Sequence, residues 1–145
     1  MAIKIYTAGK MSGLTFEEQM QWRSVFEYKL KKISDEVLVF LHPPLYYNYE
    51  SPPLHKSEAE IKEWELNKIR ECDIVVVNLD GINDSIGTHI ELGLINAMNM
   101  FGNKHIYVIG IGDATDKHPW IQSSLLRVEP DIDAACNYIN DYLLV

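Results

Sequence analysis

Glu91 is the side chain of this sequence that is best placed to do chemistry. It follows a polar, glycine-containing turn over residues 80–87, and that turn follows a continuous apolar run over residues 74–79. A carboxylate one turn into a helix behind a buried strand points toward the crevice in which open α/β sheets bind ligands. Carboxylates act there as nucleophiles or as proton donors and acceptors. The spacing Thr88-x-x-Glu91 also fits a capping box, in which the carboxylate only bonds the backbone N–H of Thr88, and spacing alone leaves both interpretations open.

A second turn, between Gly9 and Gly13, follows the first apolar run of the chain. Its spacing fits neither GxGxxG nor GxxxxGK[ST], which disfavours a standard dinucleotide or triphosphate site. A turn rich in exposed backbone before a helix can still hold a ribose or a phosphate, with Lys10 and Ser12 as contacts. A plain tight turn is the alternative, and the motif does not decide between the two.

Alternating strand and helix patterns position these turns. Four strands are predicted from apolar runs, and the second run has the continuous apolar character of a strand buried on both faces. These strands cover residues 3–7, 37–41, 74–79 and 105–111. Capping boxes at Thr15-x-x-Glu18 and Ser57-x-x-Glu60 predict two helices, the second reaching about residue 71.

Two more helices and one long loop complete the predicted pattern. One helix follows Thr88 with Ile90, Leu94, Ala97 or Met98, and Phe101 recurring on one face, and a closing helix covers residues 131–144 with Pro130 at its first position. Residues 42–53 are rich in proline and tyrosine, so they predict an irregular loop of the kind that is often functional.

The order of these elements predicts the class of the fold. Strand and helix alternate over residues 1–145, which indicates one α/β domain with a three-layer, doubly wound parallel sheet of the flavodoxin-like or Rossmann-like class. Ligands of such sheets bind beyond the carboxyl ends of the strands. That rule selects residues 7–13, 42–53 and 80–91 as the site.

The composition limits the partners of the chain. With a formal net charge of −8 and scattered Lys and Arg, it is not expected to bind a nucleic-acid polymer or an anionic membrane, although a small anionic ligand fits. Cys72 and Cys136 lie outside any metal-ligand spacing, so we expect both to be buried free thiols and expect no metal site. No cofactor is expected either. Without a signal-like segment or an apolar run that could span a bilayer, a cytoplasmic location is expected.

Three segments together resemble the nucleoside 2-deoxyribosyltransferase family. They are Tyr6 with Ala8-Gly9, the run Glu65-Leu66-Asn67-Lys68-Ile69-Arg70-Glu71-Cys72-Asp73-Ile74-Val75-Val76-Val77, and Gly87-Thr88-His89-Ile90-Glu91-Leu92-Gly93. The resemblance implies a flavodoxin-like enzyme in which a glutamate attacks the anomeric carbon of a nucleoside and passes the sugar to another base. Glu91 would be that nucleophile, Tyr6 the hydroxyl that positions it, and Glu65 the acid that protonates the departing base, where the family carries an aspartate.

A second departure from the family concerns the substrate. Six residues before Glu91 the transferases carry an aspartate, whereas this sequence has Ser85, with Asp84 displaced by one position. Related deoxynucleoside 5′-monophosphate N-glycosidases have a serine there that contacts phosphate. The resemblance therefore implies that Ser85, Ser12 and Lys10 could hold a 5′-phosphate, with ordinary turn chemistry as the alternative.

The resemblance also implies a set of ligand contacts and a homo-oligomer. Asp80 is a reserve contact for base or sugar, and the remaining expected contacts are Ala8, Gly9, Gly13, Asp84, Gly87 and Thr88. A neighbouring subunit is expected to complete the site, from a region such as residues 118–124. The ligands would be a nucleoside or nucleotide and a free nucleobase. The alternatives are a monophosphate N-glycosidase that passes the sugar to water and a nucleotide-binding module without turnover.

Overall fold

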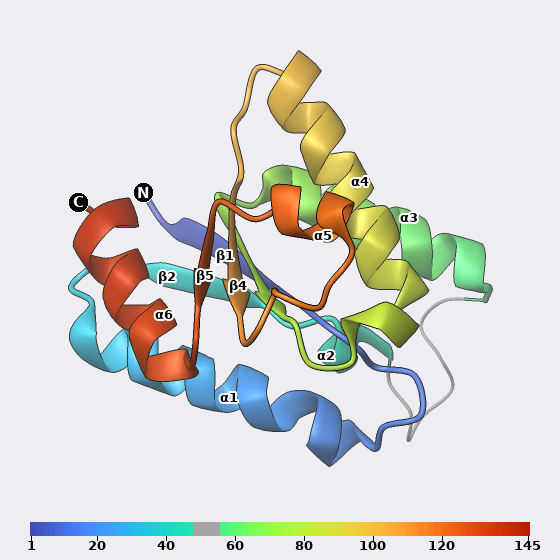
Figure 1. The fold of residues 1–145 in the computed structure, drawn as a ribbon, viewed down its shortest axis with the longest axis horizontal. Helices are drawn as coiled ribbons and strands as arrows, with labels where there is room; N and C mark the ends of the chain where they lie inside the picture. The colour runs from blue at the N-terminus through green and yellow to red at the C-terminus, as the bar shows by residue number, and fades with distance from the viewer. Residues whose placement is uncertain (48–55) are drawn as a thin grey trace.

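The computed structural model describes residues 1–47 and 56–145, which are built around one parallel β-sheet (Figure 1). Its strands are β1 (Ile3–Ala8), β2 (Leu38–Leu41), β3 (Ile74–Asn78), β4 (Tyr107–Ile111) and β5 (Arg127–Glu129). They pair in parallel in the order β2-β1-β3-β4-β5. This is the strand order of the flavodoxin-like sheet, so the predicted doubly wound α/β class is confirmed.

Helices cover both faces of the sheet. One face carries α1 (Phe16–Ile33) and α6 (Ile132–Tyr138), which continues as the π-helical turn η2 (Ile139–Leu143). The other face carries α3 (Glu58–Glu71), α4 (Ile86–Phe101) and the short α5 (Pro119–Ser123). Two clusters of buried apolar side chains lie between these layers and the sheet, one on each face. The fold therefore has the expected three layers.

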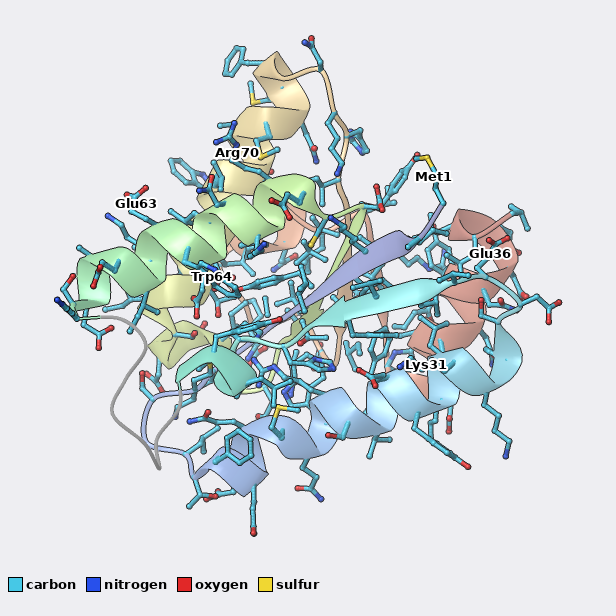
Figure 2. The ribbon with its side chains drawn as sticks, turned by 180° about the vertical axis from the view of Figure 1, so that it is seen from behind. Met1, Lys31, Glu36, Glu63, Trp64 and Arg70 are labelled. Atoms are coloured by element: carbon cyan, nitrogen blue, oxygen red, sulfur yellow. The ribbon has the colours of Figure 1, made fainter. Side chains whose placement is uncertain are left out.

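The helices α1 and α3 begin at the capping boxes that the sequence predicted. Both capping boxes are formed, at Thr15 with Glu18 and at Ser57 with Glu60. Cys72 and Cys136 are buried free thiols, as predicted. Figure 2 shows α3 lying over the sheet with Glu63 on its outer side and Trp64 on its inner side.

Several predictions about individual elements were wrong. The strand over residues 37–41 is not buried on both faces, because β2 lies at the edge of the sheet and leaves Val37 and Val39 exposed. Pro130 precedes α6 instead of opening it, since the side chain of Asp131 caps that helix through the N–H of Ala134. In α4 the inner face carries Thr88, Glu91, Leu92 and Ile95, whereas Ile90 and Phe101 are exposed.

The turn predicted over residues 80–87 contains the 3₁₀ helix η1 (Ile82–Asp84), and two short α-helices and one short strand were not predicted. The first is α2 (Pro44–Tyr47), which begins the segment expected to be irregular and packs the Tyr46 ring on Trp64 with 4.1 Å between centroids. The others are α5 and β5. Each has at most five residues, too few to show a periodic pattern. Residues 48–53 of the predicted loop lie outside the described residues.

Candidate active site

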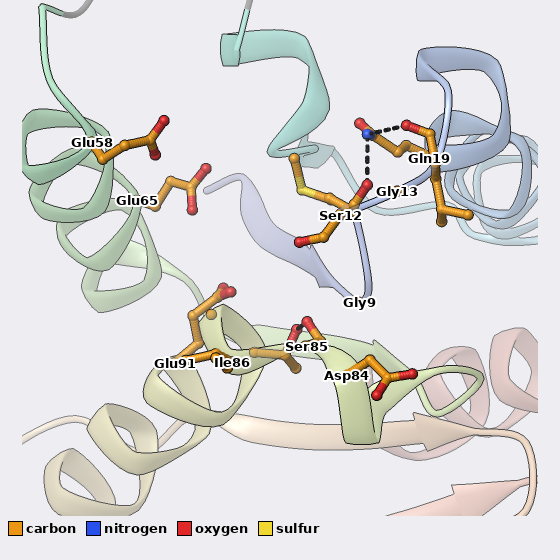
Figure 3. A pocket seen from close by; sticks show the side chains of 14 residues that line it. Gly9, Ser12, Gly13, Gln19, Glu58, Glu65, Asp84, Ser85, Ile86 and Glu91 are labelled. Carbon is orange, nitrogen blue, oxygen red and sulfur yellow. Dashed lines mark hydrogen bonds between the residues drawn. The ribbon is translucent and has the colours of Figure 1, made fainter.

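A cavity of about 500 Å³ opens at the carboxyl ends of β1 and β3, where the strand order reverses direction. Ligands of open α/β sheets bind at such a switch point. The cavity is formed by the turn after β1, the inner face of α3, the turn after β3 and the start of α4 (Figure 3). Its described lining is Gly9, Met11, Ser12, Gly13, Leu14, Gln19, Glu58, Glu65, Asp84, Ser85, Ile86, Gly87, Thr88 and Glu91.

Glu65 and Glu91 line this cavity, and the buried Tyr6 hydroxyl lies behind it, next to Glu91. Tyr6 and Glu91 are 1% and 8% exposed, and Glu65 lines the cavity opposite Glu91. Within the described part of the chain, the Tyr6 hydroxyl, Glu65 Oε1 and Glu91 Oε2 are buried without a hydrogen-bond partner. Buried polar atoms are nearly always bonded, so three such atoms in one place indicate groups that a ligand satisfies.

The structure excludes one of the two interpretations of Glu91. Helix α4 begins at Ile86 after Ser85, so Thr88 lies inside the helix and does not cap it. Thr88 Oγ1 instead shares a 2.6 Å hydrogen bond with Ser85 Oγ. The Glu91 carboxyl lies on the inner face of α4 and points into the cavity (Figure 3). The capping-box interpretation is therefore wrong, because the helix starts one turn earlier than that role requires.

Burial dominates the electrostatics of the two cavity carboxyls. It raises the pKa of Glu91 to about 8, with the Glu65 charge adding to the effect, while the Tyr6 hydroxyl and Arg23 act in the opposite direction. Burial likewise raises the pKa of Glu65 to about 7; Arg23 lowers it and Glu58 raises it. The pKa of Tyr6 is also raised well above its ordinary value, first by burial and then by the two glutamates. Carboxyls perturbed in this way within a cleft are typical of catalytic sites.

A buried arginine that the sequence analysis missed supports this site. Arg23 is fully buried in α1 and donates hydrogen bonds to the backbone carbonyls of Thr7, Gly9 and Gln19. It holds the turn after β1 in place, and its charge favours the ionised forms of both cavity carboxyls. The helical spacing of Gln19, Arg23, Phe26 and Leu30, which form the buried face of α1, was the signal available in the sequence.

Comparison with known proteins assigns the chain to a family. The family model for nucleoside 2-deoxyribosyltransferase matches residues 5–118, a range that includes Tyr6, Glu65 and Glu91. The chain belongs to the nucleoside 2-deoxyribosyltransferase family. None of the curated proteins matches it.

Two solved structures share the fold of this nucleoside 2-deoxyribosyltransferase family member. A conserved protein from Enterococcus faecalis V583 is 14% identical with a TM-score of 0.69, and the match covers 97% of this chain and 99% of that one. The CMP N-glycosidase from Clostridium botulinum is 16% identical with a TM-score of 0.57, over 96% of this chain and 99% of that one. These two structural similarities show a shared fold. The family assignment comes instead from the match of the sequence to the family model.

The end of the cavity away from α3 carries hydroxyl groups and backbone, with the Asp84 carboxylate beside Ser85. Ser12 and Gly13 come from the turn after β1, and Ser85 and Gly87 come from the start of α4. Ser85 precedes α4 without a side-chain hydrogen bond that caps the helix. The first N–H groups of a helix have no partner within it, and together with the helix dipole they attract anions. In this family member, that end of the cavity offers hydroxyl and backbone N–H groups as hydrogen-bond donors.

Some residues expected at the site lie elsewhere. Lys10 and Asp80 line a neighbouring cavity between the turn after β1 and α1, with Lys10 Nζ 3.9 Å from Asp84 Oδ2. Ala8 is buried in the core at 1% exposure. Residues 118–124 border a separate cavity on the other side of α4, together with His89.

Two polar lining residues were missed because their direction depends on tertiary packing. Gln19 donates to the carbonyls of Met11 and Leu14 and so shapes the turn after β1. Glu58 lines the cavity from the first turn of α3. In the described part of the chain no three acidic, histidine or cysteine side chains are grouped as metal ligands, and no helix is long and apolar enough to cross a membrane.

Proposed function

We propose that this chain is an enzyme that cleaves the N-glycosidic bond of a nucleoside or nucleotide and transfers the sugar through Glu91. The observation that carries the proposal is that Glu91 and Glu65 line a cavity on the switch point of the sheet, with the Tyr6 hydroxyl next to Glu91. Among the described residues, each of the three has a buried polar atom without a hydrogen-bond partner. The family match supports the same chemistry.

In the first step the ionised Glu91 carboxylate attacks the anomeric carbon on the face opposite the base. The C–N bond breaks, its electron pair goes to the base nitrogen, and Glu65 gives its proton to the base. The product is an ester between the sugar and Glu91, and the difficult displacement becomes two easier ones. The Tyr6 hydroxyl beside Glu91 fixes the orientation of the attacking oxygen.

In the second step an acceptor nitrogen of another base attacks the same carbon. The ester bond breaks, Glu91 leaves as a carboxylate, and Glu65 takes the proton of the acceptor. Two inversions give net retention at the anomeric carbon. The enzyme returns to its starting protonation, so no further reactant is needed.

The chemistry needs one proton on the carboxyl pair, and the electrostatics support that state. Burial disfavours two negative charges in one cavity, whereas Arg23 stabilises one of them. With pKa values of about 7 for Glu65 and about 8 for Glu91, the pair carries a single proton in a window near neutral pH. In the free enzyme that proton rests mainly on Glu91, so the reaction requires its transfer to Glu65 once substrate is bound. A pH profile of kcat/KM with an acid limb and a base limb is therefore expected.

A second candidate function is hydrolysis of a (deoxy)nucleoside 5′-monophosphate, in which water replaces the acceptor base. Ser12, Ser85 and the start of α4 favour it, because they offer hydroxyl and N–H donors to a phosphate at one end of the cavity. A phosphate held there places the sugar between that end and Glu91. The acceptor, base or water, then decides between transferase and hydrolase.

We also propose that the chain forms a homo-oligomer through α4, whose neighbour completes the cavity. Apolar side chains along the outer face of α4 are exposed, with Ile86 at 74%, Ile90 at 48% and Phe101 at 82%. Ile86 also lines the cavity, so a partner that covers this face reaches the site. Sedimentation of the wild type and of Ile90→Asp tests this: the wild type is expected to sediment as a dimer or larger, and the variant as a monomer.

The function is tested by chromatography of reactions with the four deoxynucleosides and their 5′-monophosphates, with and without a second free base. Base release is expected from at least one substrate, and a new nucleoside in the presence of the second base identifies a transferase. Glu91→Ala is expected to abolish turnover, and Glu63→Gln, on the outer side of α3, to leave it unchanged. Thermal stabilisation by ligand without any product would indicate a binding module instead.

A further inference from the structure

Glu58 is a third carboxylate at the cavity, beside the proposed acid. It lies in the first turn of α3, seven residues before Glu65, which puts both side chains on one face of the helix. Figure 3 shows both carboxylates directed into the same cavity from α3. The charge of Glu58 also raises the pKa of Glu65, as expected for two acidic side chains facing one space.

The other glutamates of α3 have different surroundings. Glu60 closes the capping box at Ser57, and Glu63 lies on the outer side, 3.9 Å from Lys62 Nζ. Glu71 lies 3.6 Å from Lys4 Nζ and 3.5 Å from Lys68 Nζ. Glu58 and Glu65 are the two that line the cavity. Glu58 therefore differs from Glu60, Glu63 and Glu71 in its place on the cavity.

The proposed mechanism places the departing base along α3. Glu65 has to reach a base atom next to the glycosidic bond, while the phosphate end of the cavity lies away from α3. Glu58 precedes Glu65 by about two helical turns, or roughly 10 Å of helix rise. Two long side chains converging over that span can contact the two ends of one base. Glu58 then meets the edge of the base that is remote from the sugar.

We propose that Glu58 makes the enzyme select bases with an exocyclic amino group, cytosine or adenine, by accepting a hydrogen bond from that group. This inference rests on the proposed function. An ionised carboxylate only accepts hydrogen bonds, so it pairs with the amino group of cytosine and repels the carbonyl oxygen that uracil presents at the same position. Adenine and hypoxanthine differ in the same way. A discrimination of about tenfold to a hundredfold is expected from one such contact.

The test compares deoxycytidine with deoxyuridine and deoxyadenosine with deoxyinosine, each as nucleoside and as 5′-monophosphate. The wild type is expected to favour the amino base in kcat/KM by about tenfold or more. In Glu58→Gln an amide can turn either its oxygen or its nitrogen to the base, so the ratio is expected to fall toward one, mainly through faster turnover of the keto base. Glu63→Gln, on the outer side of the same helix, is the matched control and is expected to keep the wild-type ratio.

Binding separates this inference from the proposed function. Calorimetric titration of Glu91→Gln and of Glu91→Gln/Glu58→Gln with the same substrates measures selection without turnover. If Glu91→Gln binds amino bases more tightly and the double variant does not, the inference is supported. This holds even if the wild type releases no base, because the absence of base release would contradict only the proposed function. A ratio unchanged by Glu58→Gln, or a wild-type preference for keto bases, would overturn the inference.

Discussion

Replacing Glu91 by Gln is expected to stabilise the fold increasingly as the pH rises. Gln has nearly the shape of a protonated glutamate but carries no titrating group. Glu91 is 8% exposed, and burial raises its pKa to about 8. A carboxylate kept in such a place costs stability whenever it is ionised, and the variant removes that cost.

The sign and size follow from proton linkage. The pKa of Glu91 is raised in the folded state above the value of about 4.3 for an unfolded glutamate, so the folded state binds the extra proton between these two values. The wild type therefore loses stability as the pH rises from about 5 toward 8. One proton corresponds to about 1.4 kcal/mol per pH unit, which gives about 2.5 kcal/mol between pH 5 and pH 7 for these two pKa values.

Urea unfolding followed by circular dichroism measures this effect at pH 5, 6 and 7. The free energy of unfolding of Glu91→Gln minus that of the wild type is expected to grow by about 2 kcal/mol or more over this range. Glu63→Gln, whose parent side chain is 74% exposed, is the surface control, with a difference that does not change with pH. A difference for Glu91→Gln that is equally flat would refute the claim that Glu91 is held protonated by burial.

Three other substitutions test separate parts of the site. Tyr6→Phe removes the hydroxyl beside Glu91, so kcat is expected to fall about tenfold to a hundredfold with little change in KM, and steady-state kinetics with the preferred substrate checks this. Arg23→Gln removes the charge that lowers the pKa values of Glu65 and Glu91, so the pH profile of kcat/KM is expected to move to higher pH. An unchanged profile in a folded variant would exclude this electrostatic role of Arg23. Ser85→Asp places a negative charge at the proposed phosphate end. The ratio of activity on monophosphates to activity on nucleosides is expected to fall at least about tenfold. An unchanged ratio would show that Ser85 does not bind the phosphate.

The parts of the fold that sequence analysis predicted correctly have strong local signals. The capping boxes at Thr15 and Ser57 and the buried run of β3 each carry their signal within a few residues. Elements whose signal is short or depends on neighbours were missed or misjudged. The strand β5 has three residues, and the exposure of Val39 follows from the position of β2 at the edge of the sheet, which the run itself does not encode.

The site residues likewise divide into those that local sequence patterns could identify and those that only the packing reveals. Glu91 was selected because its place behind a buried strand follows from the order of elements and because the residues around it resemble the family. Arg23 and Glu58 were not selected, because an arginine in α1 and a glutamate in α3 look like ordinary surface residues until the packing shows which way they point. The choice between helix cap and cavity residue for Glu91 likewise depended on where α4 begins, and helix boundaries are the least certain part of a sequence-based prediction.

The central claim is that a sugar ester forms on Glu91, and mass spectrometry of acid-quenched reactions tests it most directly. Enzyme mixed with its preferred substrate for less than one turnover is expected to yield a peptide containing Glu91 whose mass is increased by one sugar residue. The increase is expected to be absent from Glu91→Gln. A sugar adduct on a different residue, or a burst of free base equal to the enzyme concentration without any adduct, would contradict the account.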